Sequence, residues 1–189
     1  MKRVFIIHGW GGSPAEGWFP WLNEELLRRG FVVEVPYMPN PDEPVIDAWV
    51  HHLEQVVGQA DEATFFVGHS IGCQTILRYL ELVDVRVGGA VFVAGWFQLT
   101  DLETEDEKRI GKPWIEKRID LARVKKLINQ GTAIFSDNDP VVPFQINREV
   151  FEKELECKII VEHAKGHFSG SDDVKELPSV LEALLGSVA

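Results

Sequence analysis

The feature that most constrains the fold of this chain is a repeated alternation between short apolar runs and longer amphipathic stretches. Each short run is apolar on successive residues, which is typical of strands buried on both faces of a sheet. The apolar runs cover residues 3–8, 31–35, 64–67, 89–94, 132–136 and 157–161. Helix-like patterns cover residues 18–29, 44–59, 70–82, 121–129, 144–154 and 173–185. We therefore predict an α/β protein, a mostly parallel sheet of about six strands with helices on both faces.

Length and composition predict one domain over residues 1–189. The chain has 189 residues, of which 45% are hydrophobic, enough to bury a sizeable core. One connection, at about residues 95–120, is longer than an ordinary loop and combines aromatic residues with the charge run DLETEDEKR. The charge run favours a solvated helical face. We expect this excursion to flank the active site.

The charge and the cysteine content exclude several classes of protein. The formal net charge is −11 and no basic run offsets it, so nucleic acid and anionic membranes are not expected partners. The first residues, MKRVFIIHGW, lack the long apolar core of a signal peptide, and no segment is apolar over the length of a bilayer span. With just Cys73 and Cys157, a disulfide framework is not expected. We predict a cytoplasmic protein.

The stretch FFVGHSIGCQ places Ser70 between two glycines at the end of an apolar run. Gly68-His69-Ser70-Ile71-Gly72 matches G-x-S-x-G, in which a nucleophilic serine sits on a tight turn from strand to helix. The alternative is that Ser70 caps the following helix, as serine often does. The motif by itself does not separate the two interpretations.

A nucleophilic serine requires a histidine base and an acid that orients the base. In the fold in which this serine motif carries the nucleophile, the acid and then the histidine follow the serine, each after a later strand. Asp139 follows the strand-like AIF, and His167 lies in a glycine-flanked loop after the last predicted strand. Asp137 competes with Asp139, and His163 competes with His167; we favour Asp139 and His167.

Two backbone amides are the expected donors to an oxyanion. One belongs to Ile71, the residue after the serine, and the other to Trp10 in the loop HGWGGSP. The glycines of that loop also resemble a dinucleotide-binding motif, but Pro14 stands where the third glycine would be required. The aromatic residues predicted to form the substrate pocket are Trp96, Phe97, Trp114 and Phe168.

No cofactor and no metal are expected. The histidines are scattered, and no cysteine or histidine cluster has ligand spacing. Cys73 could be considered as a nucleophile, but it falls one turn into the predicted helix on the apolar side, where a cysteine usually packs as a small hydrophobic residue.

The chain resembles the small serine-hydrolase family of YdeN and retinoblastoma-binding protein 9, within the α/β-hydrolase superfamily. The stretches that carry this resemblance are IIHGWGGSP, GWFPWL, YMPNPDEP, VGHSIGCQTILRYLE, SDNDPVVPF and GHFSG. The resemblance implies an α/β-hydrolase fold with a minimal lid, and it places Ser70, Asp139 and His167 at the positions of the family's catalytic triad. We expect a serine hydrolase that acts on small carboxylic esters, with thioesters and amides as further candidates, through an acyl-serine intermediate.

The resemblance also raises a hypothesis of another class, a protein-interaction module on a hydrolase fold with an unused triad. The animal relative is named for binding a partner through an L-x-C-x-E element. Here LECKI, residues 155–159, has the leucine and the cysteine but isoleucine in place of the acid, and it overlaps a predicted buried strand.

Overall fold

The computed structural model describes residues 1–100, 102 and 104–188, and in these residues six parallel strands form one sheet. The order of the strands across the sheet is β2-β1-β3-β4-β5-β6. Their bounds are β1 (Arg3–Ile7), β2 (Val32–Glu34), β3 (Thr64–His69), β4 (Gly89–Val93), β5 (Gly131–Ser136) and β6 (Lys158–Glu162). The predicted parallel sheet is thereby confirmed.

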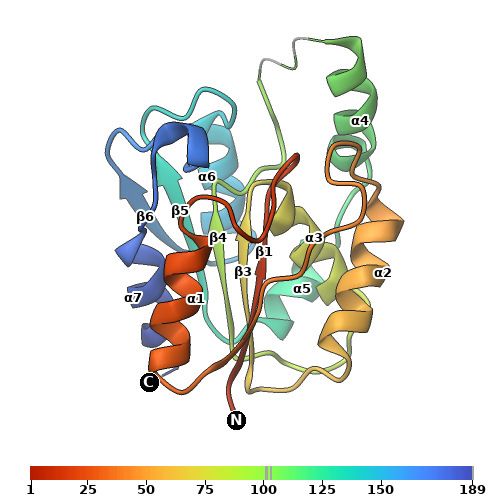
Figure 1. Cartoon of the computed structure of the whole chain (residues 1–189). Helices are drawn as coiled ribbons and strands as arrows, with labels where there is room; N and C mark the ends of the chain where they lie inside the picture. Colours follow the sequence, from red (N-terminus) through yellow and green to blue (C-terminus); the bar gives the residue numbers. More distant parts are fainter. Residues whose placement is uncertain (101, 103, 189) are drawn as a thin grey trace.

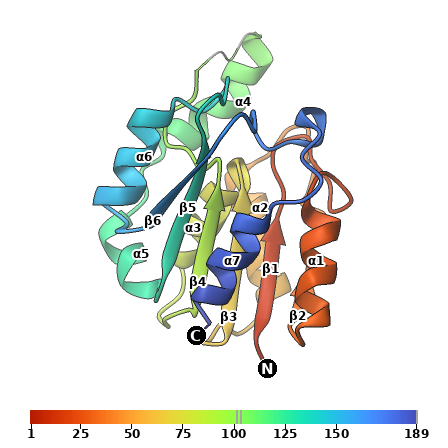
Figure 2. The ribbon, with the colours of Figure 1, turned by 90° about the vertical axis from the view of Figure 1, so that its left-hand side faces the viewer.

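Helices cover both faces of the sheet (Figures 1 and 2). One face carries α1 (Phe19–Arg28) and α7 (Pro178–Gly186). The opposite face carries α2 (Ile46–Val57), α3 (Ile71–Leu80), α5 (Leu121–Leu127) and α6 (Phe144–Lys153). A further helix, α4 (Glu105–Glu116), stands beyond one end of the strands, and a short 3₁₀ helix spans Gly170–Asp172.

The successive apolar residues of each strand divide between two cores. In β1, Val4 and Ile6 pack under α1 and α7, whereas Phe5 and Ile7 pack under the helices of the other face. All four side chains are at most 4% exposed. This two-sided burial is the physical reason for the unbroken apolar runs in the sequence, because a strand buried on one face alone would alternate.

The excursion at residues 95–120 contains α4, whose first turn is closed by a capping box between Thr104 and Glu107. Its first turns are largely exposed, as expected for the charge run. One helix differs from the sequence-based expectation. The last helix begins at Pro178 rather than near Asp173, because Asp173 has a left-handed backbone (φ 57°) that ends the preceding 3₁₀ helix. Proline is favoured in the first turn of a helix, where its missing N–H is not needed.

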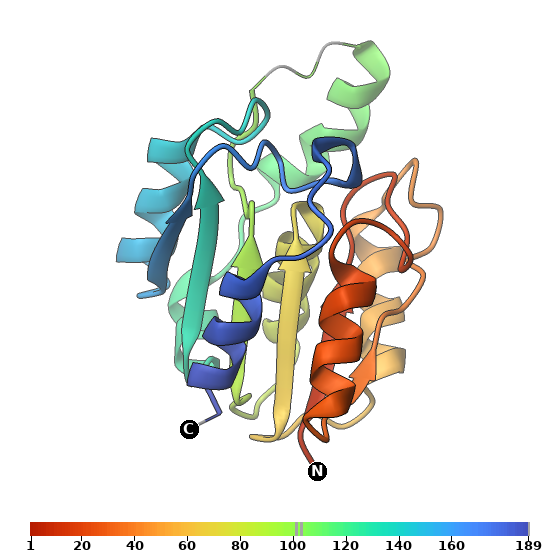
Figure 3. The ribbon, with the colours of Figure 1, turned by 60° about the vertical axis from the view of Figure 1, so that its left-hand side comes forward.

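Several loops that follow the strands lie together at one edge of the sheet, at the carboxyl ends of the strands (Figure 3). The turn after β3, the loops after β5 and β6, and α4 all lie at this edge, and both termini lie at the opposite edge. Among the described residues, no helix combines the length and the apolar character needed to cross a bilayer.

Candidate active site

Ser70 occupies a sharp turn between β3 and α3. Its backbone has φ 53° and ψ −121°, a conformation that costs a residue with a side chain about 1–3 kcal/mol. Neighbouring glycines make the turn possible. A Cβ at Gly72 would lie 2.4 Å from the carbonyl oxygen of Ile7, and one at Gly68 would lie 2.8 Å from the amide nitrogen of Cys73. The Ser70 side chain makes no capping hydrogen bond to α3, so the helix-cap interpretation is wrong.

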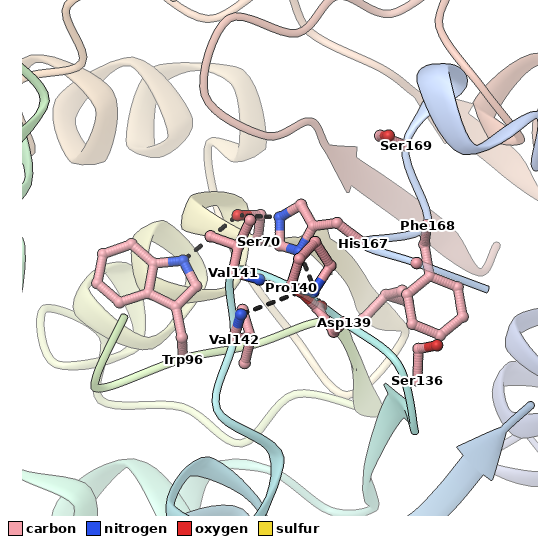
Figure 4. A network of polar contacts seen from close by, with 12 residues as sticks. Ser70, Trp96, Ser136, Asp139, Pro140, Val141, Val142, His167, Phe168 and Ser169 are labelled. Atoms are coloured by element: carbon pink, nitrogen blue, oxygen red, sulfur yellow. Dashed lines mark hydrogen bonds and ion pairs between the residues drawn. The ribbon is translucent and has the colours of Figure 1, made fainter. Parts of the chain in front are cut away.

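A chain of hydrogen bonds joins Ser70, His167 and Asp139 (Figure 4). His167 Nε2 lies 3.0 Å from Ser70 Oγ, and His167 Nδ1 lies 2.8 Å from Asp139 Oδ2. The other oxygen of Asp139 accepts hydrogen bonds from the amides of Val141 and Val142 at 2.8 and 3.0 Å. Because the carboxylate can only accept, Nδ1 carries the imidazole proton and Nε2 is free to accept from the serine hydroxyl.

The competing residues pair with each other, away from Ser70. His163 Nδ1 contacts Asp137 Oδ2, and Asp137 Oδ1 accepts from the amide of Ala164 at 2.9 Å. The side chain of His163 is 90% exposed, and the hydrogen bond from the Ala164 amide, together with that from His163, lowers the pKa of Asp137. The structure therefore brings Asp139 and His167 to Ser70, and it places Asp137 and His163 at the surface of the same loops.

Cys73 lies fully buried on α3, where its thiol donates to the carbonyl of Val93 at 3.4 Å. Burial raises the pKa of this thiol well above its ordinary value. A buried thiol with a raised pKa is a poor nucleophile. Its position fits the packing role that the sequence favours.

His69 is a site residue that the sequence analysis missed. Its Nε2 donates to the backbone carbonyl of His167 at 2.7 Å, and its ring lies among Trp18, Phe19 and His167. Burial, with the neighbouring His167 as a second cause, lowers the pKa of His69 to about 3. His69 is therefore neutral at ordinary pH and ties the end of β3 to the loop that carries His167. The signal in the sequence is a histidine directly before the motif serine.

The rest of the loop after β6 is held by further polar side chains. Trp18 Nε1 donates to the carbonyl of Phe168 at 3.1 Å, directly after the carbonyl that His69 holds. Asp172 Oδ2 accepts from the amides of His167 and Ser169 at 3.0 and 2.9 Å. Asn138 accepts from the amide of Gly166 at 2.9 Å. These bonds fix the backbone on both sides of His167.

The loop after β1 passes beside Ser70. A Cβ on Gly9 would lie 3.0 Å from the His69 ring and 3.5 Å from Ser70 Cβ. His8 is buried; its Nε2 accepts from the Met38 amide at 3.0 Å, so its Nδ1 donates to the Gly9 carbonyl at 2.8 Å. Burial lowers the pKa of His8, which favours this neutral form. His8 thus fixes the peptide group that precedes Trp10.

A cavity of about 480 Å³ opens in front of Ser70. Its apolar wall is formed by Trp10, Trp96, Leu99, Leu102, Ile110 and Val141. Acidic side chains also line it, namely Glu16, Asp42, Asp106 and Glu107. Except for the two tryptophans, these lining residues were not predicted, because single leucines and valines in loops carry no sequence signal for a pocket.

Of the four predicted pocket aromatics, Trp96 lines the cavity, Trp114 and Phe168 are buried in the cores, and the partly buried Phe97 packs against one of them. Phe97 packs on Phe151, and Trp114 is buried against Trp49. Phe168 belongs to the core under α1 and α7. None of these three side chains lines the cavity in front of Ser70, so the structure does not bring them to the candidate site.

The segment LECKI does not present a binding peptide. Leu155 and Cys157 are each 5% exposed and belong to the core, and β6 begins at the next residue, Lys158. A partner could not reach both side chains without unfolding this edge. Within the described part of the chain, no group of three or more acidic, histidine or cysteine residues is arranged to hold a metal ion.

Comparisons with known proteins find similar chains over nearly the whole length. A family model described as Serine hydrolase matches residues 4–185. YdeN of Bacillus subtilis (strain 168) is 33% identical over 186 residues, which cover 97% of this chain and 94% of YdeN. The serine hydrolase RBBP9 of Rattus norvegicus is 29% identical over 189 residues, with 97% of this chain and 95% of RBBP9 covered. The crystal structure of the B. subtilis ydeN gene product superposes with a TM-score of 0.90 at 27% identity, covering 100% of this chain and 99% of the other.

More distant solved structures share the fold. Est1E from Butyrivibrio proteoclasticus is 16% identical with a TM-score of 0.71, covering 97% of this chain and 88% of Est1E. The α/β-hydrolase fold predicted from the sequence is confirmed.

Proposed function

The chain belongs to the serine hydrolase family, and from this premise we propose that it cleaves small carboxylic esters through an acyl intermediate on Ser70. The observation that carries the proposal is the hydrogen-bonded chain from Asp139 through His167 to Ser70 Oγ. Thioesters and amides are further candidate substrates, because they pass through the same tetrahedral intermediate.

The first half of the proposed reaction acylates the serine. Ser70 Oγ attacks the carbonyl carbon of the ester while His167 Nε2 takes the hydroxyl proton. Asp139 holds the imidazole in the tautomer that can accept this proton and stabilises the imidazolium that forms. The carbonyl π electrons move onto oxygen; when they return, the ester C–O bond breaks and the leaving alcohol takes the proton from His167.

The second half releases the acid. A water molecule gives a proton to His167 and attacks the acyl carbon, and Ser70 leaves with the proton that His167 returns. In both halves the oxyanion would accept from the amides of Trp10 and Ile71. In the described part of the chain neither amide makes a backbone hydrogen bond, and the nearby Gly9 carbonyl is already engaged by Gly12 and His8. These amides are available as donors.

The cavity supports a small substrate. Its volume of about 480 Å³ is near the lower end of the range for small-molecule sites, and much of its wall is apolar. We therefore propose esters of short acyl chains or small alcohols. A panel of aryl esters with increasing acyl length tests this, and kcat/KM is expected to fall once the acyl chain exceeds the cavity.

A fluorophosphonate probe tests the nucleophile. Ser70 Oγ would attack phosphorus and expel fluoride, while His167 takes the hydroxyl proton, which leaves one stable adduct. Intact mass should show a single addition, and peptide mapping should place it on Ser70. The Ser70→Ala variant should give none. The Ser169→Ala variant removes the other serine hydroxyl at the described cavity and should keep the adduct on Ser70. An unlabelled wild-type protein, or an adduct elsewhere, would overturn the proposal.

A further inference from the structure

The indole of Trp96 lies against the oxygen of Ser70 on the side away from His167 (Figure 4). Trp96 Nε1 donates to Ser70 Oγ at 3.3 Å, and the side chain is 1% exposed. We propose that Trp96 is a further catalytic residue, whose N–H stabilises negative charge on the nucleophile oxygen itself. This inference rests on the proposed function of Ser70.

The hydrogen-bonding capacity of Ser70 Oγ is divided between the two partners. A serine hydroxyl has one proton to donate and two lone pairs. His167 Nε2 can only accept in the tautomer that Asp139 favours, so the hydroxyl proton points to His167. An indole N–H can only donate, so Trp96 occupies a lone pair. The two contacts together fix the rotation of the hydroxyl in the orientation that proton transfer requires.

The hydrogen bond from Trp96 to Ser70 Oγ should become stronger in the transition state. Hydrogen bonds to a charged acceptor are about twice as strong as those to a neutral one. As Oγ loses its proton during attack, and again when it leaves the acyl carbon, negative charge develops on it. A donor at that oxygen is thus bound more tightly in the transition state than in the ground state, which is the condition for acceleration. The oxyanion amides act on a different atom, the carbonyl oxygen of the substrate.

The position of Trp96 is fixed from α3. Gln74 Nε2 donates to the backbone carbonyl of Trp96 at 2.7 Å, and Gln74 Oε1 accepts from Arg78 Nη2 at 3.1 Å. Because a guanidinium cannot accept a hydrogen bond, Arg78 sets which end of the Gln74 amide faces Trp96. Gln74 and Arg78 are 1% and 4% exposed, so both contacts are made in the interior.

The other side of the segment is fixed from α6. Asn147 Oδ1 accepts from the amides of Phe97 and Gln98 at 2.7 and 3.0 Å, and its Nδ2 donates to the Gln98 carbonyl at 2.9 Å. Asn147 is fully buried. The backbone next to Trp96 is therefore clamped between two helices, which is the support that a group acting on a reacting atom requires.

The Trp96→Phe variant removes the N–H and keeps an aromatic ring in place. Loss of one donor to a developing charge corresponds to a 10- to 100-fold loss of rate. We expect kcat on a short-chain ester, and the rate constant of fluorophosphonate labelling, to fall about 10- to 100-fold, with KM changed less than about threefold. The matched control is Trp114→Phe, because the Trp114 indole is also buried and donates to a carbonyl, that of Pro44 at 3.0 Å, outside the cavity.

A second replacement removes the hydrogen-bond donor with almost no change of shape. Incorporation of benzothienylalanine at position 96 exchanges the indole N–H for sulfur, and it should reproduce the loss seen with phenylalanine. Melting temperature and far-UV circular dichroism of each variant report whether the fold is intact. An intact benzothienylalanine protein with wild-type kcat and labelling rate would overturn the role of Trp96 and leave Ser70 as nucleophile. Failure of the wild-type protein to be labelled at Ser70 would instead overturn the proposed function.

Discussion

Two of the segments that border the cavity are held in place by different kinds of contact. The loop after β6 is fixed by buried or partly buried donors and acceptors, among them His69 and Trp18. The first turns of helix α4, in the segment after β4, are tied to the body through exposed ion pairs, such as that between Arg109 and Glu43 at 3.0 Å, whereas the buried Trp114 holds the end of the helix. The base of the proposed proton-transfer chain, His167, therefore lies on the loop with the buried contacts. Part of the apolar wall, Leu102 and Ile110, comes from the segment whose ion pairs are exposed to solvent and salt.

The largest expected effect on catalysis comes from replacing Asp139, the acid that holds His167. The Asp139→Asn variant should lose about 10⁴-fold in kcat/KM, because an amide can donate to Nδ1 and so favours the wrong tautomer of His167. The matched variant Asp137→Asn, in the same loop but paired with the exposed His163, should lose less than about tenfold. Steady-state kinetics on one short-chain ester measure both, and equal losses would contradict the assignment of Asp139.

Acidification should lower the free energy of unfolding through His69, which holds the loop after β6. The pKa of His69 is lowered from its ordinary value of 6.5 to about 3 in the folded protein. Between these two pH values the unfolded chain therefore binds a proton at this residue that the folded chain does not. The free energy of unfolding should therefore fall with decreasing pH between about 6.5 and 3, by about 1.4 kcal/mol per pH unit from this residue. Above pH 6.5 this contribution is fully present.

Urea unfolding at pH 6.5, 5.5 and 4.5 measures this dependence. The His69→Gln variant lacks the titrating group and should be less stable at pH 6.5, with a shallower dependence on pH. The lowered pKa of His8 adds to the slope in both proteins and cancels in the comparison. Parallel slopes for the two proteins would show that His69 does not titrate as inferred.

The smallest effect is expected from breaking the exposed ion pairs of α4. The Arg109→Ala variant removes ion pairs with Glu43 and Asp106 whose side chains are more than half exposed. Such pairs contribute little to stability and are screened by salt. We expect Tm to change by about 2 °C or less, kcat to stay the same and KM to change less than about twofold. A loss of kcat comparable with that of a buried contact would show that α4 is held as firmly as the loop after β6.

The parts of the molecule with strong local signals were predictable from the sequence. The strands follow from unbroken apolar runs, and the turn at Ser70 follows from glycines that no other residue could replace sterically. Helix α4 also carried a local signal, because Thr104 and Glu107 have the spacing of a capping box. The charge run, interpreted as a solvated helical face, indicated the same helix.

The parts that depend on long-range packing were not predictable. Trp96 and Trp114 are both buried tryptophans in one excursion, yet one touches Ser70 and the other packs on α2. No periodicity distinguishes them, because the difference depends on where Gln74 and Asn147 hold the backbone. The role of His69 likewise depends on a carbonyl 98 positions away in the sequence.

The place of His69 between Ser70 and the loop after β6 has a consequence for biosynthesis. The nucleophile turn needs β3, α3 and β4, because the Ser70 amide donates to the Val93 carbonyl at 2.9 Å, but the base lies about a hundred residues after the serine, on the loop that follows β6. A nascent chain halted after β5 would hold Ser70 on its strained turn with no imidazole to activate it. Reactivity toward a serine-directed probe would then appear only when the final strand and helix have docked, so it would report that the whole chain has folded.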